Sequence, residues 1–499
     1  MPTRPAAARL ARATKTIQTQ AVELMSTREQ NSGQESKSES QQPQLRRRLG
    51  ILNATSINMS NMIGIGPFIT VPIILGTMGG PQALLAWFAG AVLAIADGLV
   101  IAELGAALPG SGGTYVFLRD SYNRQSWGKL MAWLFAWEFL FFGPLEIASG
   151  TVGMTQYMSY LWTGLGRHPW GIKLVAASIA VLVMLSLYRK IHDVAKLMLI
   201  LWITTLVTTG WVIVTGLGHM DLHMAFSFPA SAFHLNWAFL IGLGNGTIVV
   251  IYNYLGYYQV CYLGDEVKRP ERTIPYAVII SILAVTVIDF LISFSFVSVV
   301  PWQEMIKPGS MANLAVASVF MQKIYGHWAA ILLTAMILFT AFASVFALML
   351  GYSRIPYAAA GDGLFFGWFA KLHPTGEFPN RSLVLVGILA AVASMFSLGD
   401  IITGLMVARI LIQFVGHTIG LFVLRKTQPE VRLPFKMWLY PAPAILALVG
   451  WLCIFGSSAF QPGGWKFMAY AFSTICVGIG GYFILAYKKR MWPMAPREQ

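Results

Sequence analysis

The dominant pattern in the sequence is a series of long apolar runs separated by short polar connections. Each run holds roughly 20 apolar residues, the length that an α-helix needs to cross a hydrocarbon core of about 30 Å. The pattern predicts an all-α polytopic membrane protein with twelve transmembrane helices. The expected spans are residues 50–77, 81–108, 127–161, 168–187, 191–216, 236–264, 272–300, 327–359, 381–397, 400–424, 436–460 and 463–487.

Two of these spans are interrupted in mid-membrane. The first contains "NMIGIGPFIT" (61–70), and the sixth contains "IYNYLGYYQ" (251–259), about 190 residues later. Spans two to five have counterparts in spans seven to ten at a similar offset. Because five crossings are an odd number, the second group of five has the opposite topology, which gives a five-plus-five inverted repeat. Discontinuous helices at matching positions of such a repeat indicate the central site of a secondary transporter.

The two interruptions have complementary chemistry. An unwound segment is stable in a membrane only where protein, water or a ligand satisfies its backbone groups. Gly64 and Gly66 permit unusual backbone angles, and Pro67 suits the first turn of a restarting helix, so the amides near Ile65 and Gly66 would face an anion. Freed carbonyls at the second interruption would suit an ammonium group; they belong to Tyr252, Asn253 and Leu255. A site for an anion beside a site for an ammonium group would suit an amino acid. The alternative is that the glycines only kink a structural helix and bind no ligand.

Composition agrees with a membrane protein. The chain is 56% hydrophobic and 11% charged, with a mean hydropathy of +0.62, whereas soluble domains average about 25% charged residues. The net charge of +14 comes from bases beside the spans and does not indicate nucleic-acid binding. These bases concentrate in alternate connections, so the positive-inside rule places both termini in the cytoplasm. We expect a multi-pass protein of the plasma or inner membrane.

The domain boundaries follow from the spans and the repeat. Residues 1–45 are polar and predict a disordered cytoplasmic tail. Its basic, acid-free start resembles a transit peptide, and Met25 is the alternative start of the protein. Residues 46–230 form the first repeat, with helices 1 to 5, and residues 231–430 form the second, with helices 6 to 10. Residues 431–490 hold two peripheral helices, and 491–499 form a second cytoplasmic tail.

The sequence resembles the amino acid, polyamine and organocation (APC) transporter superfamily. Within that superfamily it is most similar to the L-type amino acid transporter and related permeases. The resemblance covers nearly all of residues 50–487. Its strongest stretches are "IGIGPFIT", "AELGAALPGSGGTY", "DEVKRPERTIPYAVIIS", "SRIPYAAAGDG" and "PFKMWLYPAPAILALVGWLCIF". It implies the leucine-transporter fold, with helices 1 and 6 discontinuous, and a substrate held at their unwound centres.

The resemblance also implies the residues that contact the substrate. They are Ile63, Gly64, Ile65, Gly66, Tyr252, Asn253 and Leu255, and Tyr252 matches an aromatic gate. The sequence departs from the family at Ile65, where a small polar residue is common, at Pro67, which removes an amide, and at Leu255, where glycine is usual. Sodium-independent members often carry a lysine midway along helix 5. In this sequence Thr204 or Thr205 occupies that region. Lys196 lies too near the cytoplasmic end to replace the lysine. The sequence therefore leaves open whether transport is coupled to a proton gradient or to a sodium gradient.

Ionisable residues at membrane depth are costly and suggest function. They are Asp97, Glu103, Glu138, Glu146, Asp289 and Arg409. We expect Glu103 and Glu138 to be structural partners and Asp289 to have a packing role. Glu146 is a candidate for contact with a cationic substrate or for carrying a proton, with a structural role equally open, and Arg409 would neutralise one of the acids. Tyr257 and Tyr258 would join Tyr252 in lining a tyrosine-rich pocket.

The leading function is therefore secondary active transport of amino acids by alternating access. Transport of a polyamine or another organocation is the alternative, favoured if Glu146 faces the pocket. A channel or a membrane enzyme is more distant, because the sequence has no HExxH or GxSxG element and no glycine-lysine loop for ATP. We expect no enzyme activity, no cofactor and no metal site. The expected partners are a small-molecule substrate, which is an amino acid or a polyamine, and the lipid bilayer. Whether the protein has an accessory subunit stays open.

Overall fold

A computed structural model describes residues 49–494 except 111, 169, 189–193, 374–377 and 462, and gives no side-chain position for 166–167, 194–199, 201 and 265. The predicted tail at 1–45, the alternative start at Met25 and most of the predicted tail at 491–499 lie outside the described residues. The side chain of Lys196 also lies outside them.

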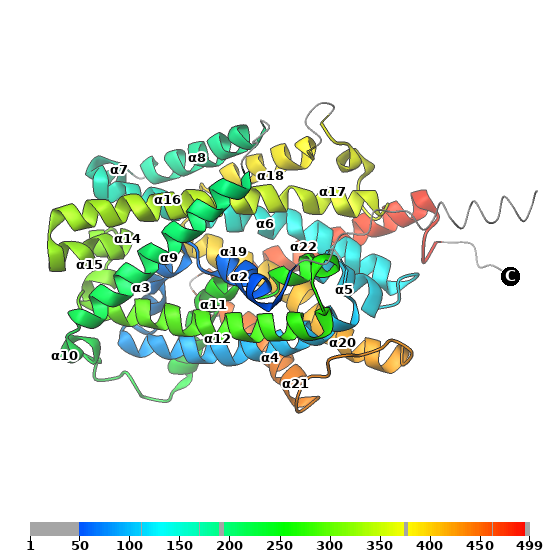
Figure 1. The fold of residues 1–499 in the computed structure, drawn as a ribbon, viewed down its shortest axis with the longest axis horizontal. Coiled ribbons are helices and arrows are strands. Elements are labelled where there is room, and N and C mark those ends of the chain that lie inside the picture. The colour runs from blue at the N-terminus through cyan, green and yellow to red at the C-terminus, as the bar shows by residue number, and fades with distance from the viewer. Residues whose placement is uncertain are drawn as a thin grey trace, which may run out of the picture. The chain divides into compact units, whose positions relative to one another are not determined.

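The described part of the chain is helical, and its only β-type pairing is an isolated bridge between Leu49 and Val267. Figure 1 shows the arrangement of the helices. The longer α-helices are α2 (Ile51–Met62), α3 (Gly66–Met78), α4 (Leu85–Ala107), α6 (Trp127–Leu161), α8 (Gly171–Leu187), α9 (Val194–Gly218), α11 (Trp237–Tyr254), α12 (Pro270–Val297), α16 (His327–Tyr352), α18 (Asn380–Ala393), α19 (Leu398–Arg409), α20 (Gly416–Thr427), α21 (Ala442–Ser458) and α22 (Gly464–Lys489).

Shorter helices connect these elements. The α-helices among them are α5 (Thr114–Ser121), α7 (Thr163–Arg167), α10 (Leu222–Ala225), α13 (Trp302–Ile306), α14 (Met311–Leu314), α15 (Val316–Tyr325) and α17 (Arg354–Gly361). The 3-10 helices are η1 (Pro81–Leu84), η2 (Gln259–Tyr262), η3 (Gly264–Glu266) and η4 (Gly367–Ala370). A π-helical segment, η5 (Ile410–Val415), joins α19 to α20.

The protein has several helices that suit a membrane. Within the described residues, seven helical segments are long and apolar enough to span a bilayer, and the bent pair α2 and α3 makes an eighth. Four further apolar helices are shorter, at Gly171–Leu187, Trp202–Gly218, Asn380–Ala393 and Ala442–Ser458. Each of the twelve ranges expected from the sequence overlaps one of these helices or the bent pair, while the count of twelve crossings stays a prediction.

The first predicted interruption is a sharp bend between two helices. α2 ends at Met62, α3 begins at Gly66, and the two helix axes differ by 53°. Pro67 lies in the first turn of α3, where its fixed φ angle favours helix and its missing N–H costs nothing. A β-carbon on Gly64 would lie 2.8 Å from Ser344 Oγ on α16, and one on Gly66 would collide with Asn253 Oδ1. Glycine therefore lets this bend pack closely against the side chains of Ser344 and Asn253.

The second interruption lies slightly later than the sequence suggests. α11 continues through Tyr252 and Asn253 and ends at Tyr254, after which the chain leaves the helix at Leu255. Gly256 has a φ angle of 118°, which a residue with a side chain rarely adopts. The Tyr252 carbonyl accepts a 3.3 Å hydrogen bond from the Leu255 amide, so this oxygen is not freed by the end of the helix.

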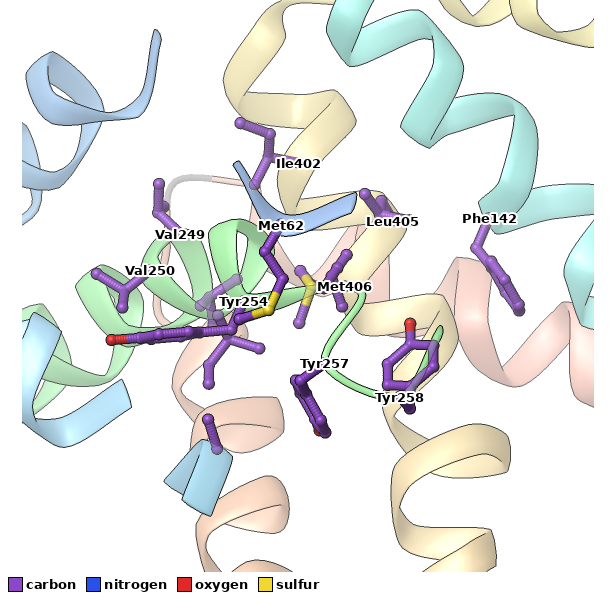
Figure 2. Packing of buried hydrophobic residues seen from close by; sticks show 14 of the residues in the cluster. Met62, Phe142, Val249, Val250, Tyr254, Tyr257, Tyr258, Ile402, Leu405 and Met406 are labelled. Carbon is purple, nitrogen blue, oxygen red and sulfur yellow. The ribbon is translucent and has the colours of Figure 1, made fainter. Parts of the chain in front are cut away.

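The two interruptions share one buried core. α11 packs against α3 and α4, and α12 packs against α4, α2 and α9. On the other side, α6 packs against α16, α19 and α18. Met62 at the end of α2, Tyr257 in the second interruption and Met406 on α19 belong to one apolar cluster, which Figure 2 shows from close by. Large apolar side chains on outer faces are exposed, as membrane contact requires; they include Leu182, Val214, Val287 and Ile484.

Candidate functional site

A cavity of about 910 Å³ reaches both interruptions. Ile63 lines it from the first and Tyr258 from the second, while Ser344 on α16 and Arg409 at the end of α19 form further parts of its wall. Three phenylalanines of α6 supply apolar surface; they are Phe135, Phe139 and Phe142. Most small-molecule sites have volumes of about 300–1,000 Å³, so the cavity can hold a metabolite with its water.

The same cavity extends to a polar region formed by α5 and α17. Tyr115, Arg119, Arg354 and Asp362 line this part. Arg119 donates hydrogen bonds to Asp362 at 2.9 Å and to Asp120 at 2.8 Å, which ties α5 to the end of α17. Burial, and then the nearby Asp362 carboxylate, raise the pKa of the Tyr115 hydroxyl above its ordinary value, so Tyr115 is uncharged there.

The structure separates the predicted substrate residues into two groups. Ile63 and Tyr258 line the cavity. The others lie next to it in the packed region between the interruptions, and most of them are buried; these are Gly64, Ile65, Gly66, Tyr252, Asn253, Leu255 and Tyr257. Nearby residues that the sequence analysis did not select, such as Phe139, Ser344 and Tyr352, line the cavity instead. None of the three belongs to an interruption of a span, which was the feature used to select residues.

The first interruption has an unused backbone donor. Among the described residues, the Ile65 amide donates to no acceptor, whereas the amides of Ile63 and Gly64 donate to the carbonyls of Met59 and Met62. Gly66 opens α3, and the first amides of a helix have no intrahelical partner. The positive end of the α3 dipole lies at this place. The local geometry therefore suits an anionic group such as a carboxylate.

Polar side chains hold the two interruptions together. Asn253 Nδ2 donates to Thr70 Oγ1 on α3 and to the Val249 carbonyl, both at 3.1 Å. The Tyr252 hydroxyl lies 2.8 Å from Ser149 Oγ on α6, and the Tyr252 ring lies 3.5 Å from the position that a β-carbon on Gly66 would occupy. Tyr252 therefore lies between the start of α3 and α6, beside the free amide.

Glu146 forms a buried ion pair with Arg409, which lines the cavity. Arg409 Nη2 lies 2.5 Å from Glu146 Oε2, and the two side chains are only 1% and 8% exposed. Tyr352 donates to the same carboxylate oxygen at 2.6 Å, and Arg409 Nη1 donates to the Tyr258 hydroxyl at 3.0 Å. The guanidinium also lies 4.4 Å from the centre of the Phe142 ring. In this structure Arg409 is paired with Glu146 among the acids named in the sequence analysis.

Asp97 is the acceptor of a second buried network. Tyr257 donates to Asp97 Oδ2 at 2.5 Å, while Trp451 Nε1 and His417 Nε2 lie 2.8 Å and 2.9 Å from Oδ1. The Tyr257 hydroxyl therefore points to α4 and not into the cavity. His417 and Trp451 lie more than 300 residues from Asp97 and follow no local motif, so these contacts could not be predicted from the sequence.

The other candidate residues have distinct surroundings. Glu103 accepts from Arg425 Nε at 2.7 Å and from the Met437 amide at 2.8 Å, and Glu138 accepts from Thr474 at 3.1 Å. Asp289 is fully buried, and both of its carboxylate oxygens lack a hydrogen-bond partner within the described structure. Thr205 lines the cavity and lies 3.5 Å from Thr340 on α16. Thr204 instead donates to the Ile200 carbonyl within α9.

We found no arrangement that would hold a metal ion among the described residues, where no three His, Cys, Asp or Glu side chains gather. The polar groups that line the cavity include hydroxyls, the side-chain amides of Asn61, Gln259 and Gln413, and the charged groups of Arg119, Arg354, Asp362 and Arg409. Such groups bind and orient a polar solute.

Comparison with known proteins agrees with this arrangement. The sequence model of the family described as "Amino acid permease" matches residues 49–483. The chain is 27% identical to the serine/threonine exchanger SteT of Bacillus subtilis over 83% of this chain and 91% of that protein. It is 24% identical to the methylthioribose transporter of the same bacterium over 82% and 88%. It is 25% identical to the vacuolar cationic amino acid transporter 4 of Arabidopsis thaliana over 78% and 64%.

The family match covers nearly all of the described structure, including both interruptions and every element of the cavity wall. The long apolar helices and the small-molecule cavity are the features that a membrane permease needs. The chain is an integral, multi-pass membrane protein that belongs to the amino acid permease family of the APC superfamily.

Proposed function

We propose that the protein is a secondary active transporter of amino acids that works by alternating access. The substrate is held where α3 begins and α11 ends, with its carboxylate at the amides of Ile65 and Gly66. The free Ile65 amide beside a large cavity is the observation that carries this proposal. A carboxylate there gains two backbone donors and the positive end of a helix dipole.

The ammonium group of the substrate is bound at the end of α11. The last carbonyls of a helix have no intrahelical donor, and α11 ends at Tyr254 opposite the first interruption. The Leu255 amide already bonds to the Tyr252 carbonyl, so the carbonyls of Asn253 and Leu255 are the better candidates. Tyr252 stands over this space and serves as the aromatic gate.

The topology in this proposal has twelve crossings in a five-plus-five inverted repeat with both termini in the cytoplasm. The bend between α2 and α3 and the end of α11 occupy matching positions, each in the first helix of its repeat. The polar part of the cavity at Arg119 and Arg354 lies on the basic side of the protein. By the positive-inside rule we place that side in the cytoplasm, and we infer that the polar part of the cavity faces the cytoplasm.

A neutral amino acid is the favoured substrate. Glu146 is an acidic candidate next to the cavity, and Arg409 compensates its charge at 2.5 Å. A cationic substrate would have to compete with a guanidinium that is already desolvated and held by Tyr258. The serine/threonine exchanger among the relatives fits this proposal. The cationic amino acid transporter among them keeps an organic cation as the alternative substrate class.

Ion coupling has a specific candidate. Thr205, Thr340 and Ser344 place three hydroxyl groups where α9 and α16 approach Gly64. Sodium ions are bound by oxygen ligands, including hydroxyls and the carbonyls of unwound helices. These groups favour sodium over a proton, because none of the three titrates near neutral pH.

Uptake into proteoliposomes tests the proposal. A panel of radiolabelled amino acids and polyamines should show saturable uptake of a neutral amino acid that is stimulated by the same amino acid inside the vesicles. Sodium and pH gradients should be imposed separately, and only the sodium gradient should drive accumulation. Non-saturable flux without counter-substrate stimulation would indicate a channel and contradict the proposal.

A further inference from the structure

A second pocket lies apart from the transport cavity, at the start of α12. It has a volume of about 440 Å³ and is lined by Arg269, Glu271, Arg272, Arg432 and Pro434. The first three residues open α12, and the last two belong to the connection between α20 and α21. None of its lining residues is shared with the transport cavity.

The pocket has an uncompensated positive charge. Three guanidinium groups face one carboxylate, and none of the three arginines forms an ion pair or a side-chain hydrogen bond within the described structure. Arg119, Arg409 and Arg425 by contrast are each paired with an acid. Guanidinium groups bind phosphate with paired, planar hydrogen bonds, which makes a cluster of free arginines suited to that anion.

The surroundings place the pocket at a membrane surface. α12 is one of the helices that can span a bilayer, so its first turn lies near the boundary between lipid and water. Tyr276, one turn after Arg272, is 52% exposed. Trp438 and Leu439, in the same connection as Arg432, are 59% and 83% exposed. Exposed tyrosine and tryptophan are typical of the headgroup level of a membrane.

We propose that this pocket binds the phosphate of an anionic phospholipid of the leaflet that it faces. The three arginines contact the phosphate oxygens, and the positive end of the α12 dipole favours an anion at this place. The acyl chains lie along the exposed apolar surface near Tyr276 and Leu439. The adjacent apolar surface favours a lipid over a free phosphate ion, because a phosphate ion has no apolar group that could contact this surface.

Lipid binding by the purified full-length protein tests this proposal. The variant Arg269→Gln/Arg272→Gln/Arg432→Gln is compared with the parent in native mass spectrometry and in thermal unfolding, each with added phosphatidylglycerol or phosphatidylcholine. The control variant is Lys371→Gln/Lys426→Gln/Lys488→Gln, which removes the same charge from exposed residues outside the pocket.

The parent and the control should prefer phosphatidylglycerol, and the arginine variant should bind it on the order of 100-fold more weakly, since each base contributes several-fold. An arginine variant that keeps the preference, or a control that loses it equally, would overturn the proposal. Inorganic phosphate is added in a further arm and should stabilise the parent much less than the lipid does. Equal stabilisation by phosphate would overturn the assignment to a lipid. The single variant Arg432→Gln, which changes only the connection, should show a partial loss.

Discussion

The Glu146 carboxylate and the Arg409 guanidinium lie 2.5 Å apart and connect α6 to the last residue of α19. Directly after Arg409 the chain becomes π-helical over Ile410–Val415, an irregularity that is frequent at functional sites. The pair is desolvated on both sides, and its two charges cancel. The cavity wall is therefore polar but electrically neutral at this depth, which favours a substrate without net charge.

Removing one partner of this pair should be costly. Glu146→Gln leaves Arg409 buried without a counter-ion, and breaking a buried ion pair from one side costs about 3–5 kcal/mol. Thermal unfolding in detergent should show a large decrease in stability for Glu146→Gln. The double variant Glu146→Gln/Arg409→Met removes both charges and should recover most of that loss. A double variant as unstable as the single one would mean that the unpaired charge of Arg409 does not cause the loss of stability.

The single variant Glu146→Gln also distinguishes a cationic substrate from a neutral amino acid. If the transported substrate is a cation, Glu146→Gln should weaken its binding by on the order of 1–3 kcal/mol, the range for a hydrogen bond to a charged group. Binding of a neutral amino acid should change much less, as we expect here. Competition uptake with neutral and cationic amino acids measures both effects in one preparation.

The first interruption should tolerate no side chain at Gly66. A β-carbon there collides with Asn253 Oδ1 and enters the space beside the Ile65 amide. Gly66→Val should therefore abolish substrate binding while the protein still inserts in the membrane. Gly76→Val is the matched control in the same helix, because a β-carbon on Gly76 meets no atom within 4 Å. Uptake by Gly66→Val at the parent's affinity would remove this interruption from the binding site.

The sequence allowed the helices and their interruptions to be predicted for a physical reason. Apolar runs and glycines are local features, and the membrane forces backbone groups to be satisfied within each span. Within the predicted stretch 251–259 the helix continues to Tyr254, and the sequence pattern does not show that the chain leaves the helical conformation only just before Gly256, whose φ angle is positive. Long-range partners were not predictable in this way. Nothing local to Asp97 indicates His417 or Trp451.

Asp97 and Asp289 are both fully buried aspartates, which makes them a matched pair for the same substitution. Asp97 accepts hydrogen bonds from Tyr257 and Trp451 and lies within hydrogen-bond distance of His417. Asp97→Asn places an amide donor against these groups. Because a buried donor without an acceptor costs about 1–3 kcal/mol, the variant should lose stability of that order. Thermal unfolding in detergent measures the loss, and stability equal to the parent would contradict the importance of this network.

Asp289→Asn should behave differently. Neither carboxylate oxygen of Asp289 has a partner among the described residues, so the substitution removes no hydrogen bond and keeps the shape of the side chain. We expect its stability to stay within about 1 kcal/mol of the parent, because the cost of the new buried donor is offset by the removal of a carboxyl group that is itself buried without partners. Uptake driven by sodium and by pH gradients should also be unchanged if Asp289 has only a packing role. A variant that is as stable as the parent but fails to accumulate substrate under one of these gradients would show that the carboxyl group takes part in coupling.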